Sequence, residues 1–137
     1  MDCSHRSRSS AAEDLTVETF WRRFDILPLL VCTDGAVSMF GRDVRRLRPN
    51  ILIEGVDGTD ERHWPGATLR LPHAEVGIVD LRGRCVMTTY DPDTAEPDPE
   101  VLRDIVRRFG GRLCLNAHVL RPGDAHEGDI VELLSRA

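Results

Sequence analysis

The sequence contains no lysine, because all 18 basic residues of the 137-residue chain are arginines. A Schiff base to pyridoxal phosphate or to a carbonyl substrate requires a lysine amine, and a Walker-type phosphate loop requires its own lysine. The sequence therefore excludes a Schiff base to pyridoxal phosphate or to a carbonyl substrate, and it excludes a Walker-type phosphate loop. An anionic ligand would have to be bound by guanidinium groups, backbone N–H groups and hydroxyls.

Signals for a membrane, for secretion and for nucleic acid are also missing. No apolar run approaches the roughly 20 residues that a membrane-spanning helix needs. Residues 1–14 contain no apolar segment typical of a secretory signal. The net charge of −5 provides no basic footprint for nucleic acid. We therefore expect a cytoplasmic protein that binds neither a membrane nor nucleic acid.

The cysteines form no CxxC pair and no Cys/His cluster with zinc-finger spacing, which argues against a structural zinc site. They are Cys3, Cys32, Cys85 and Cys114. Without a secretory signal, the expectation is a reduced protein with free thiols. Cys32 and Cys114 lie within apolar runs, so we expect both in the core.

The length and the 41% hydrophobic content fit one domain with a substantial core. Residues 1–15 are polar and without periodicity, which predicts a flexible arm before a folded domain over residues 16–137. Short apolar segments predict strands over residues 26–32, 51–53, 68–71, 74–81, 84–89, 113–120 and 130–134. Residues 16–24 fit either a short helix or an extended segment, and residues 36–40 fit a brief helix. An apolar stripe predicts one main helix over residues 99–109, so the pattern indicates a mostly β barrel or sandwich.

Cys85 is the first candidate for chemistry, because it ends a predicted strand before a long polar loop. A thiol there could be a nucleophile, a persulfide carrier or a soft-metal ligand. Neighbouring Arg82 and Arg84 would favour the thiolate that each role needs. The alternative is a buried structural cysteine, and spacing alone does not decide between these roles.

Arg48 is the second candidate, because it lies beside Pro49 at the entrance of a predicted strand. Its guanidinium could bind a phosphate or a polar heterocycle through two parallel hydrogen bonds, and the alternative is a solvated basic face. The acidic stretch at residues 91–94 favours a rigid turn over a hard-cation site. His63 and His118 have no partner at metal-ligand spacing.

Three motifs together resemble the MOSC domain, the module at the C-terminus of molybdenum cofactor sulfurases that also occurs in the mitochondrial amidoxime reducing component. They are LRPN at residues 47–50 followed by ILI, RCVMTT at residues 84–89 followed by YDPDT, and a C-terminal stretch from Asn116 through PGD at residues 122–124 to Gly128 and Asp129. The resemblance spans residues 24–135. It implies a MOSC-type β-barrel-like fold and a molybdenum–molybdopterin cofactor.

The same resemblance implies which residues would bind the cofactor, with Cys85 as the molybdenum ligand. The implied cofactor contacts are Thr33, Asp34, Arg48, Gly83, Arg84 and Asn116. Two positions depart from the family pattern: Ala95 stands where glycine is usual, and Leu47 replaces phenylalanine. Longer relatives place a separate β-barrel domain before this one. We therefore expect a site that is half-open, or one that is completed by a companion β-barrel domain on another chain or by a second copy.

Three functions stay open on these residues. The first is a molybdenum-cofactor protein that reduces an N- or S-oxygenated small molecule, with electrons from a separate donor because no flavin, haem or iron–sulfur motif is present. The second is a sulfur carrier, in which Cys85 receives a persulfide from a cysteine desulfurase and passes it to an acceptor. The third is a non-catalytic binding module that has kept the fold.

Overall fold

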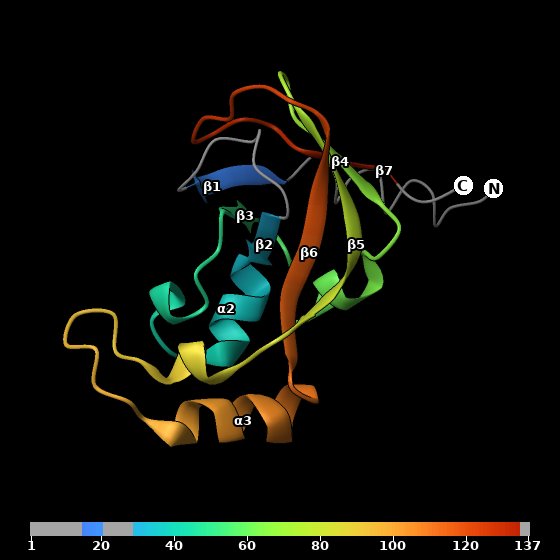
Figure 1. Ribbon diagram of the computed structural model, residues 1–137. Helices are drawn as coiled ribbons and strands as arrows, with labels where there is room; N and C mark the ends of the chain where they lie inside the picture. The colour runs from blue at the N-terminus through green and yellow to red at the C-terminus, as the bar shows by residue number, and fades with distance from the viewer. Residues whose placement is uncertain (1–14, 21–28, 135–137) are drawn as a thin grey trace.

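The computed structural model describes residues 15–20 and 29–134, so almost all of the predicted arm lies outside the described residues. One seven-stranded sheet has the order β1-β3-β2-β6-β5-β4-β7 (Figure 1). Its strands are β1 (Thr16–Phe20), β2 (Leu29–Thr33), β3 (Ile51–Glu54), β4 (Thr68–Arg70), β5 (Glu75–Gly83), β6 (Arg112–Arg121) and β7 (Glu132–Leu134). The helices are α2 (Asp34–Phe40) and α3 (Pro99–Phe109), with 3-10 turns η1 (Val44–Arg46), η2 (Asp60–His63) and η3 (Val86–Thr89). Among the described residues, no helix is long and apolar enough to cross a membrane.

The two edges of the sheet meet, which curls the sheet into a barrel-like shape. Thr16 of β1 forms an antiparallel bridge with Ile130, just before β7. The Val17 N–H donates to the Asp129 carbonyl at 2.9 Å, and the Gly128 N–H donates to the Val17 carbonyl at 2.8 Å. The mostly β, barrel-like fold predicted from the sequence is confirmed.

Strand β2 is buried on both faces, because it separates two hydrophobic clusters. Leu29 and Val31 belong to the cluster that all the strands share. Leu30 and Cys32 belong to a second cluster, which α2 and α3 build against the outside of the sheet. Since successive side chains of a strand point to opposite faces, a continuous apolar run is what this central position requires.

Helix α3 lies at one end of the molecule in Figure 1, and it confirms the one main helix of the prediction. The Asp98 side chain accepts the Glu100 N–H at 3.1 Å and so caps the first turn. Val101, Ile105 and Phe109 are buried against the sheet at a spacing of one helical turn.

Cys32 of β2 and Cys114 of β6 form a disulfide across neighbouring strands, with a Cα–Cα distance of 4.7 Å. The prediction of free thiols is therefore wrong for this pair, whereas the prediction that both lie in the core is confirmed. The pairing joins residues 82 positions apart. Such a pairing follows from strand order, which cysteine spacing alone does not show.

Candidate functional site

Cys85 lies between β5 and η3, separated from the end of β5 by Arg84, and its free thiol is exposed. The prediction of a strand over residues 84–89 is wrong, because Val86–Thr89 form η3. The β-branched residues suggested a strand, but the hydroxyls of Thr88 and Thr89 donate back to the carbonyls of Cys85 at 2.9 Å and Val86 at 2.6 Å. Such local hydrogen bonds compete with strand pairing.

The turn after Cys85 is anchored in the protein, although the thiol itself is exposed. Thr88 and Thr89 are buried, and the Thr88 N–H also donates to the Cys85 carbonyl at 3.1 Å. The backbone on each side of the thiol is therefore fixed by hydrogen bonds. This arrangement suits a metal ligand or a nucleophile, because the reactive atom is accessible and its position is defined.

Arg46 connects the Cys85 segment to the segment that precedes Arg48. Its guanidinium donates to the carbonyls of Thr89 at 2.9 Å and Thr88 at 3.4 Å. It also lies 3.7 Å from the Asp91 carboxylate. Two motifs that stand about forty residues apart in the sequence thus form one local structure.

The acidic loop after Thr89 is a turn, as predicted. The Asp91 carboxylate accepts the N–H groups of Asp93 at 2.8 Å and Thr94 at 3.0 Å. These backbone hydrogen bonds lower the pKa of Asp91 from its ordinary value. Ala95, where the family pattern has glycine, adopts the left-handed conformation with φ 64°. No group of three potential metal-binding side chains occurs in the described part of the chain.

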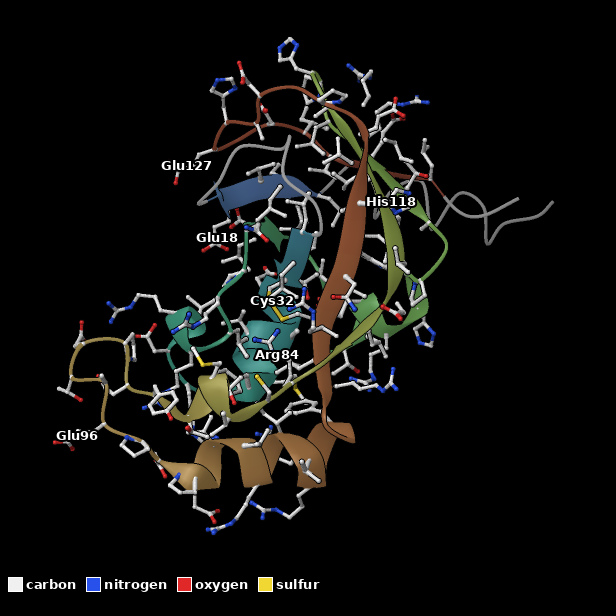
Figure 2. The ribbon with its side chains drawn as sticks, in the orientation of Figure 1. Glu18, Cys32, Arg84, Glu96, His118 and Glu127 are labelled. Atoms are coloured by element: carbon white, nitrogen blue, oxygen red, sulfur yellow. A yellow bond between two sulfur atoms is a disulfide. The ribbon has the colours of Figure 1, made fainter. Side chains whose placement is uncertain are left out.

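Arg84 carries the most unusual electrostatics of the site. One of its nitrogens, Nη2, donates to the Leu47 carbonyl, whereas Nε and Nη1 are buried and have no hydrogen-bond partner among the described residues. Burial, and next the charge of Arg82, lower the pKa of Arg84 to about 10. Figure 2 shows Arg84 in the middle of the view, whereas Glu96 and Glu127 project from the periphery.

These unpaired nitrogens test whether the site fits an anionic cofactor. A buried cation without partners is costly, so a protein that keeps one at neutral pH commonly does so for a ligand. An anionic pterin dithiolene or phosphate would supply the missing acceptors at Arg84, and the Cys85 thiol beside it would supply a soft ligand for molybdenum. The residues present therefore fit the implied group.

Arg48 is exposed and directly follows Leu47, whose carbonyl accepts the hydrogen bond from Arg84. Its backbone is left-handed, with φ 57°, which is strained for a side chain with a Cβ. Asn50 fixes the segment, because its N–H donates to the Leu30 carbonyl at 2.8 Å and its side chain accepts the Leu30 N–H at 2.7 Å. Strain at an exposed arginine of a fixed segment is consistent with a binding role.

Asn116 does not offer a free amide. Its oxygen accepts a hydrogen bond from Arg82, and its nitrogen donates to the Asp80 carboxylate at 2.7 Å. Gly83 ends β5 opposite Arg112 of β6 and is exposed, with open space where a Cβ would lie. Gly83 thus adjoins Arg84 and Cys85, while Asn116 lies one strand away and is engaged within the protein.

Thr33 and Asp34 lie where β2 meets α2, and their side chains serve the fold. The Thr33 hydroxyl is buried and accepts the Ala36 N–H at 3.2 Å as the cap of α2. The Asp34 carboxylate accepts the N–H groups of Gly55 and Val56, both at 2.9 Å. Their cofactor contacts stay predictions, and the groups named here are already paired.

Glu61 is a residue of this region that the sequence analysis missed. Its carboxylate is fully buried and accepts hydrogen bonds from the Thr33 hydroxyl at 2.9 Å and the Cys114 N–H at 2.8 Å. Burial raises the pKa of Glu61, and the two hydrogen bonds oppose that shift. Nothing in the polar stretch at residues 54–67 distinguishes this carboxylate from its neighbours. Only the fold shows that it lies beneath the disulfide strands.

Comparison with known proteins agrees with these motifs. The family model for the MOSC domain matches residues 36–132. The human protein "Mitochondrial amidoxime reducing component 2" is 34% identical over 96 residues, and the protein of the same description from Macaca fascicularis is 31% identical over 96 residues. The match covers 66% of this chain and only 28% of each of these relatives.

Solved structures share the fold at low sequence identity. The YuaD protein from Bacillus subtilis superposes with a TM-score of 0.56 at 16% identity, over 90% of this chain and 86% of the other. YiiM from Escherichia coli superposes with a TM-score of 0.54 at 15% identity, over 90% of this chain and 70% of the other. Because the family model covers well over half of the chain, including the segments of Arg48 and Cys85, this protein belongs to the MOSC domain family.

Proposed function

We propose that this MOSC domain binds the molybdenum–molybdopterin cofactor, with Cys85 as the metal ligand and with Arg84 and Arg48 as partners for its anionic groups. The observation that carries the proposal is that two buried nitrogens of Arg84, the residue before the exposed Cys85, have no hydrogen-bond partner in the described part of the chain. The relatives named for amidoxime reduction support the same direction, although the match covers 28% of their length.

The residues of the chain would divide the work of binding. A thiol must lose its proton to ligate a metal, and the attraction between Cys85 and the Arg84 guanidinium counts among the influences on the pKa of Arg84. Arg84 would neutralise negative charge close to the metal, and exposed Arg48 would bind a more distant anionic group of the cofactor. The hydrogen-bonded turn at Thr88 would hold the sulfur in place.

When bound, the cofactor would supply a metal position for two-electron reduction of an N- or S-oxygenated small molecule. The electrons would come from a separate donor protein. A companion β-barrel domain would complete the cofactor site, since the match covers only 28% of the relatives.

Molybdenum analysis tests the proposal directly. We would express the chain in a host that makes the cofactor and measure molybdenum per chain in wild type, Cys85→Ser and Cys3→Ser. The expected result is about one molybdenum per chain in wild type and in Cys3→Ser, and a loss in Cys85→Ser, because serine is a poor soft-metal ligand. A folded wild-type chain without molybdenum would contradict the proposal for this chain.

Sulfur transfer is a second candidate, favoured by the exposure of the free Cys85 thiol. In this role the thiolate attacks the outer sulfur of a desulfurase persulfide; Cys85 gains that sulfur and the desulfurase recovers its thiol. Incubation with a cysteine desulfurase and cysteine should then add the mass of one sulfur atom to wild type and Cys3→Ser. Cys85→Ser should gain none.

A further inference from the structure

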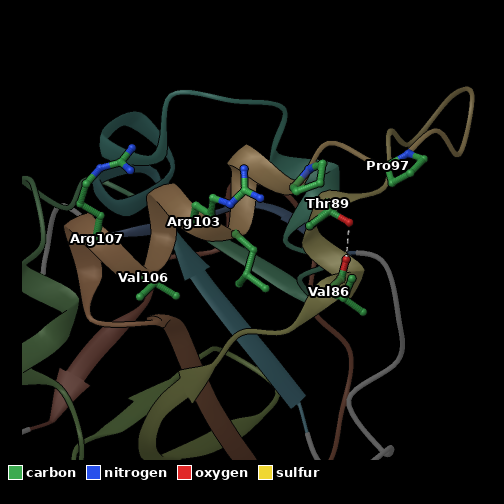
Figure 3. A pocket seen from close by; sticks show the side chains of 8 residues that line it. Val86, Thr89, Pro97, Arg103, Val106 and Arg107 are labelled. Atoms are coloured by element: carbon green, nitrogen blue, oxygen red, sulfur yellow. Dashed lines mark hydrogen bonds between the residues drawn. The ribbon is translucent and has the colours of Figure 1, made fainter.

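An apolar groove lies between α3 and the η3 segment, beside the candidate site (Figure 3). Its volume is about 550 Å³. Val86 and Thr89 line one side, Leu102 and Val106 of α3 line the other, and Pro97 belongs to the segment that joins them. Because Val86 directly follows Cys85, the groove begins one residue from the thiol.

The apolar lining of this groove is uncovered in the described structure. Val106 is 56% exposed and Val86 is 54% exposed, although both are aliphatic. Val106 belongs to the apolar stripe that predicted α3. Val101, Ile105 and Phe109 of that stripe are buried, whereas Val106 is not. Apolar side chains gathered in a concave place beside a reactive group are typical of a ligand site.

The two charged side chains that line the groove, Arg103 and Arg107, are both positive, and no carboxylate of the described residues belongs to its lining. Arg103 also pairs with Glu100 at 3.1 Å, and Arg107 pairs with Asp104 at 3.1 Å. An apolar groove with this rim favours a negatively charged ligand over a neutral or cationic one of equal size.

We propose that the groove binds a small molecule with an apolar body and a negatively charged group, and that this group pairs with Arg103 and Arg107. The opposite end of the ligand then lies beside Val86, the residue that follows Cys85 in the chain. The assignment of this end as the one that reacts rests on the proposed function. The preference for an anionic ligand rests only on the residues that line the groove. The inference thus names a substrate class: amphiphilic anions.

A pair of fluorescent probes tests this preference without metal or turnover. Anilinonaphthalene sulfonate has an apolar aromatic body and one negative charge, and N-phenylnaphthylamine is its neutral counterpart. We expect saturable binding of the sulfonate at one site per chain, about tenfold tighter than the neutral probe, because pairing with Arg103 and Arg107 adds to apolar contact.

Matched variants locate the bound probe. Val106→Glu places a carboxylate in the groove and should weaken sulfonate binding by about tenfold or more. Val79→Glu makes the same change at a similarly exposed valine of β5, 51% exposed and outside the groove lining, and should leave binding unchanged. Arg103→Met should reduce the preference for the sulfonate and leave binding of the neutral probe intact. Circular dichroism confirms that each variant is folded.

The inference is overturned if Val106→Glu binds the sulfonate as wild type does, or if the neutral probe binds as tightly as the sulfonate. The titration requires neither Cys85 nor molybdenum. Failure of the groove proposal is therefore distinguishable from failure of the cofactor proposal, which the metal content of Cys85→Ser decides.

Discussion

The Arg84 guanidinium donates a hydrogen bond to the backbone carbonyl of Leu47, and this bond ties the residue before Cys85 to the residue before Arg48. Two of the three motifs that identify the family thus meet through this arginine. The other two nitrogens of that arginine are buried without a partner among the described residues. The same side chain therefore both organises the site and leaves it electrostatically incomplete.

Replacing Arg84 by methionine should stabilise the chain in the absence of cofactor. The variant removes a buried charge whose lowered pKa, about 10, reflects the cost of burial. We expect Arg84→Met to raise the free energy of unfolding by about 1 kcal/mol, because the desolvation cost of the buried charge outweighs the one hydrogen bond to the Leu47 carbonyl that the variant loses. Urea denaturation of the metal-free proteins at neutral pH measures this change.

Arg46→Met is the control for that experiment. The Arg46 guanidinium is paired with the carbonyls of Thr88 and Thr89 and with Asp91. Its removal should lower the free energy of unfolding by about 1–2 kcal/mol, since buried carbonyls lose their donor. If Arg84→Met lowered the free energy of unfolding as much as Arg46→Met does, the Arg84 nitrogens would have hydrogen-bond partners in solution, and the prediction would be wrong.

Arg48→Gly should be more stable than Arg48→Ala. Both variants remove the guanidinium, but only glycine removes the Cβ from the left-handed position at φ 57°. We expect a difference of about 1 kcal/mol in the free energy of unfolding, because the left-handed conformation costs residues with a Cβ about that much. Both variants should retain less molybdenum than wild type. Equal stability of the two would indicate that the segment relaxes when the arginine is removed.

Glu61 should make the chain more stable in mildly acidic than in neutral solution. Burial raises its folded pKa above the ordinary value of 4.5, so the folded state holds the proton more tightly than the unfolded state. The stabilisation is complete below that ordinary value and is lost as the pH rises through the folded pKa. Unfolding of wild type and Glu61→Gln between about pH 4.5 and about pH 7.5 measures it. The difference between the two proteins should change with pH, and a constant difference would contradict the raised pKa.

Loss of the Cys32–Cys114 disulfide should destabilise the chain substantially. The bond joins residues 82 positions apart, so it restricts the unfolded chain strongly. We expect Cys32→Ala combined with Cys114→Ala to lower the free energy of unfolding by about 2–4 kcal/mol. A reductant should shift the thermal unfolding of wild type and leave that of the double variant unchanged. An identical response of both proteins would show that the thiols are not paired.

The elements of this fold were predictable where a local pattern decides them. The Asp98 cap, the stripe at Val101, Ile105 and Phe109 and the terminal Gly110 specify α3 within its own residues. The segment at residues 84–89 misled the prediction, because its β-branched residues favour a strand. The hydroxyls of Thr88 and Thr89 stabilise a turn instead, through hydrogen bonds to nearby backbone carbonyls that cannot be predicted from composition.

The candidate site was predictable only in part. Cys85, Arg84 and Gly83 adjoin one another along the chain, and the Leu47 contact brings the segment of Arg48 to them. Thr33 and Asn116 were named through the family resemblance. In the structure, the Thr33 hydroxyl donates to Glu61, and the Asn116 side chain accepts from Arg82 and donates to Asp80.

The sequence by itself determined the excluded lysine chemistry, the main helix, the β-rich class and the motifs of the MOSC family, because these depend on residue identity and short-range pattern. Only the tertiary structure decided that Cys32 pairs with Cys114, that Glu61 is buried, and that two Arg84 nitrogens lack partners within residues 15–20 and 29–134. The physical reason is that pairing and desolvation depend on which groups surround an atom in space. In this protein those neighbours come from strands and turns far apart in the chain.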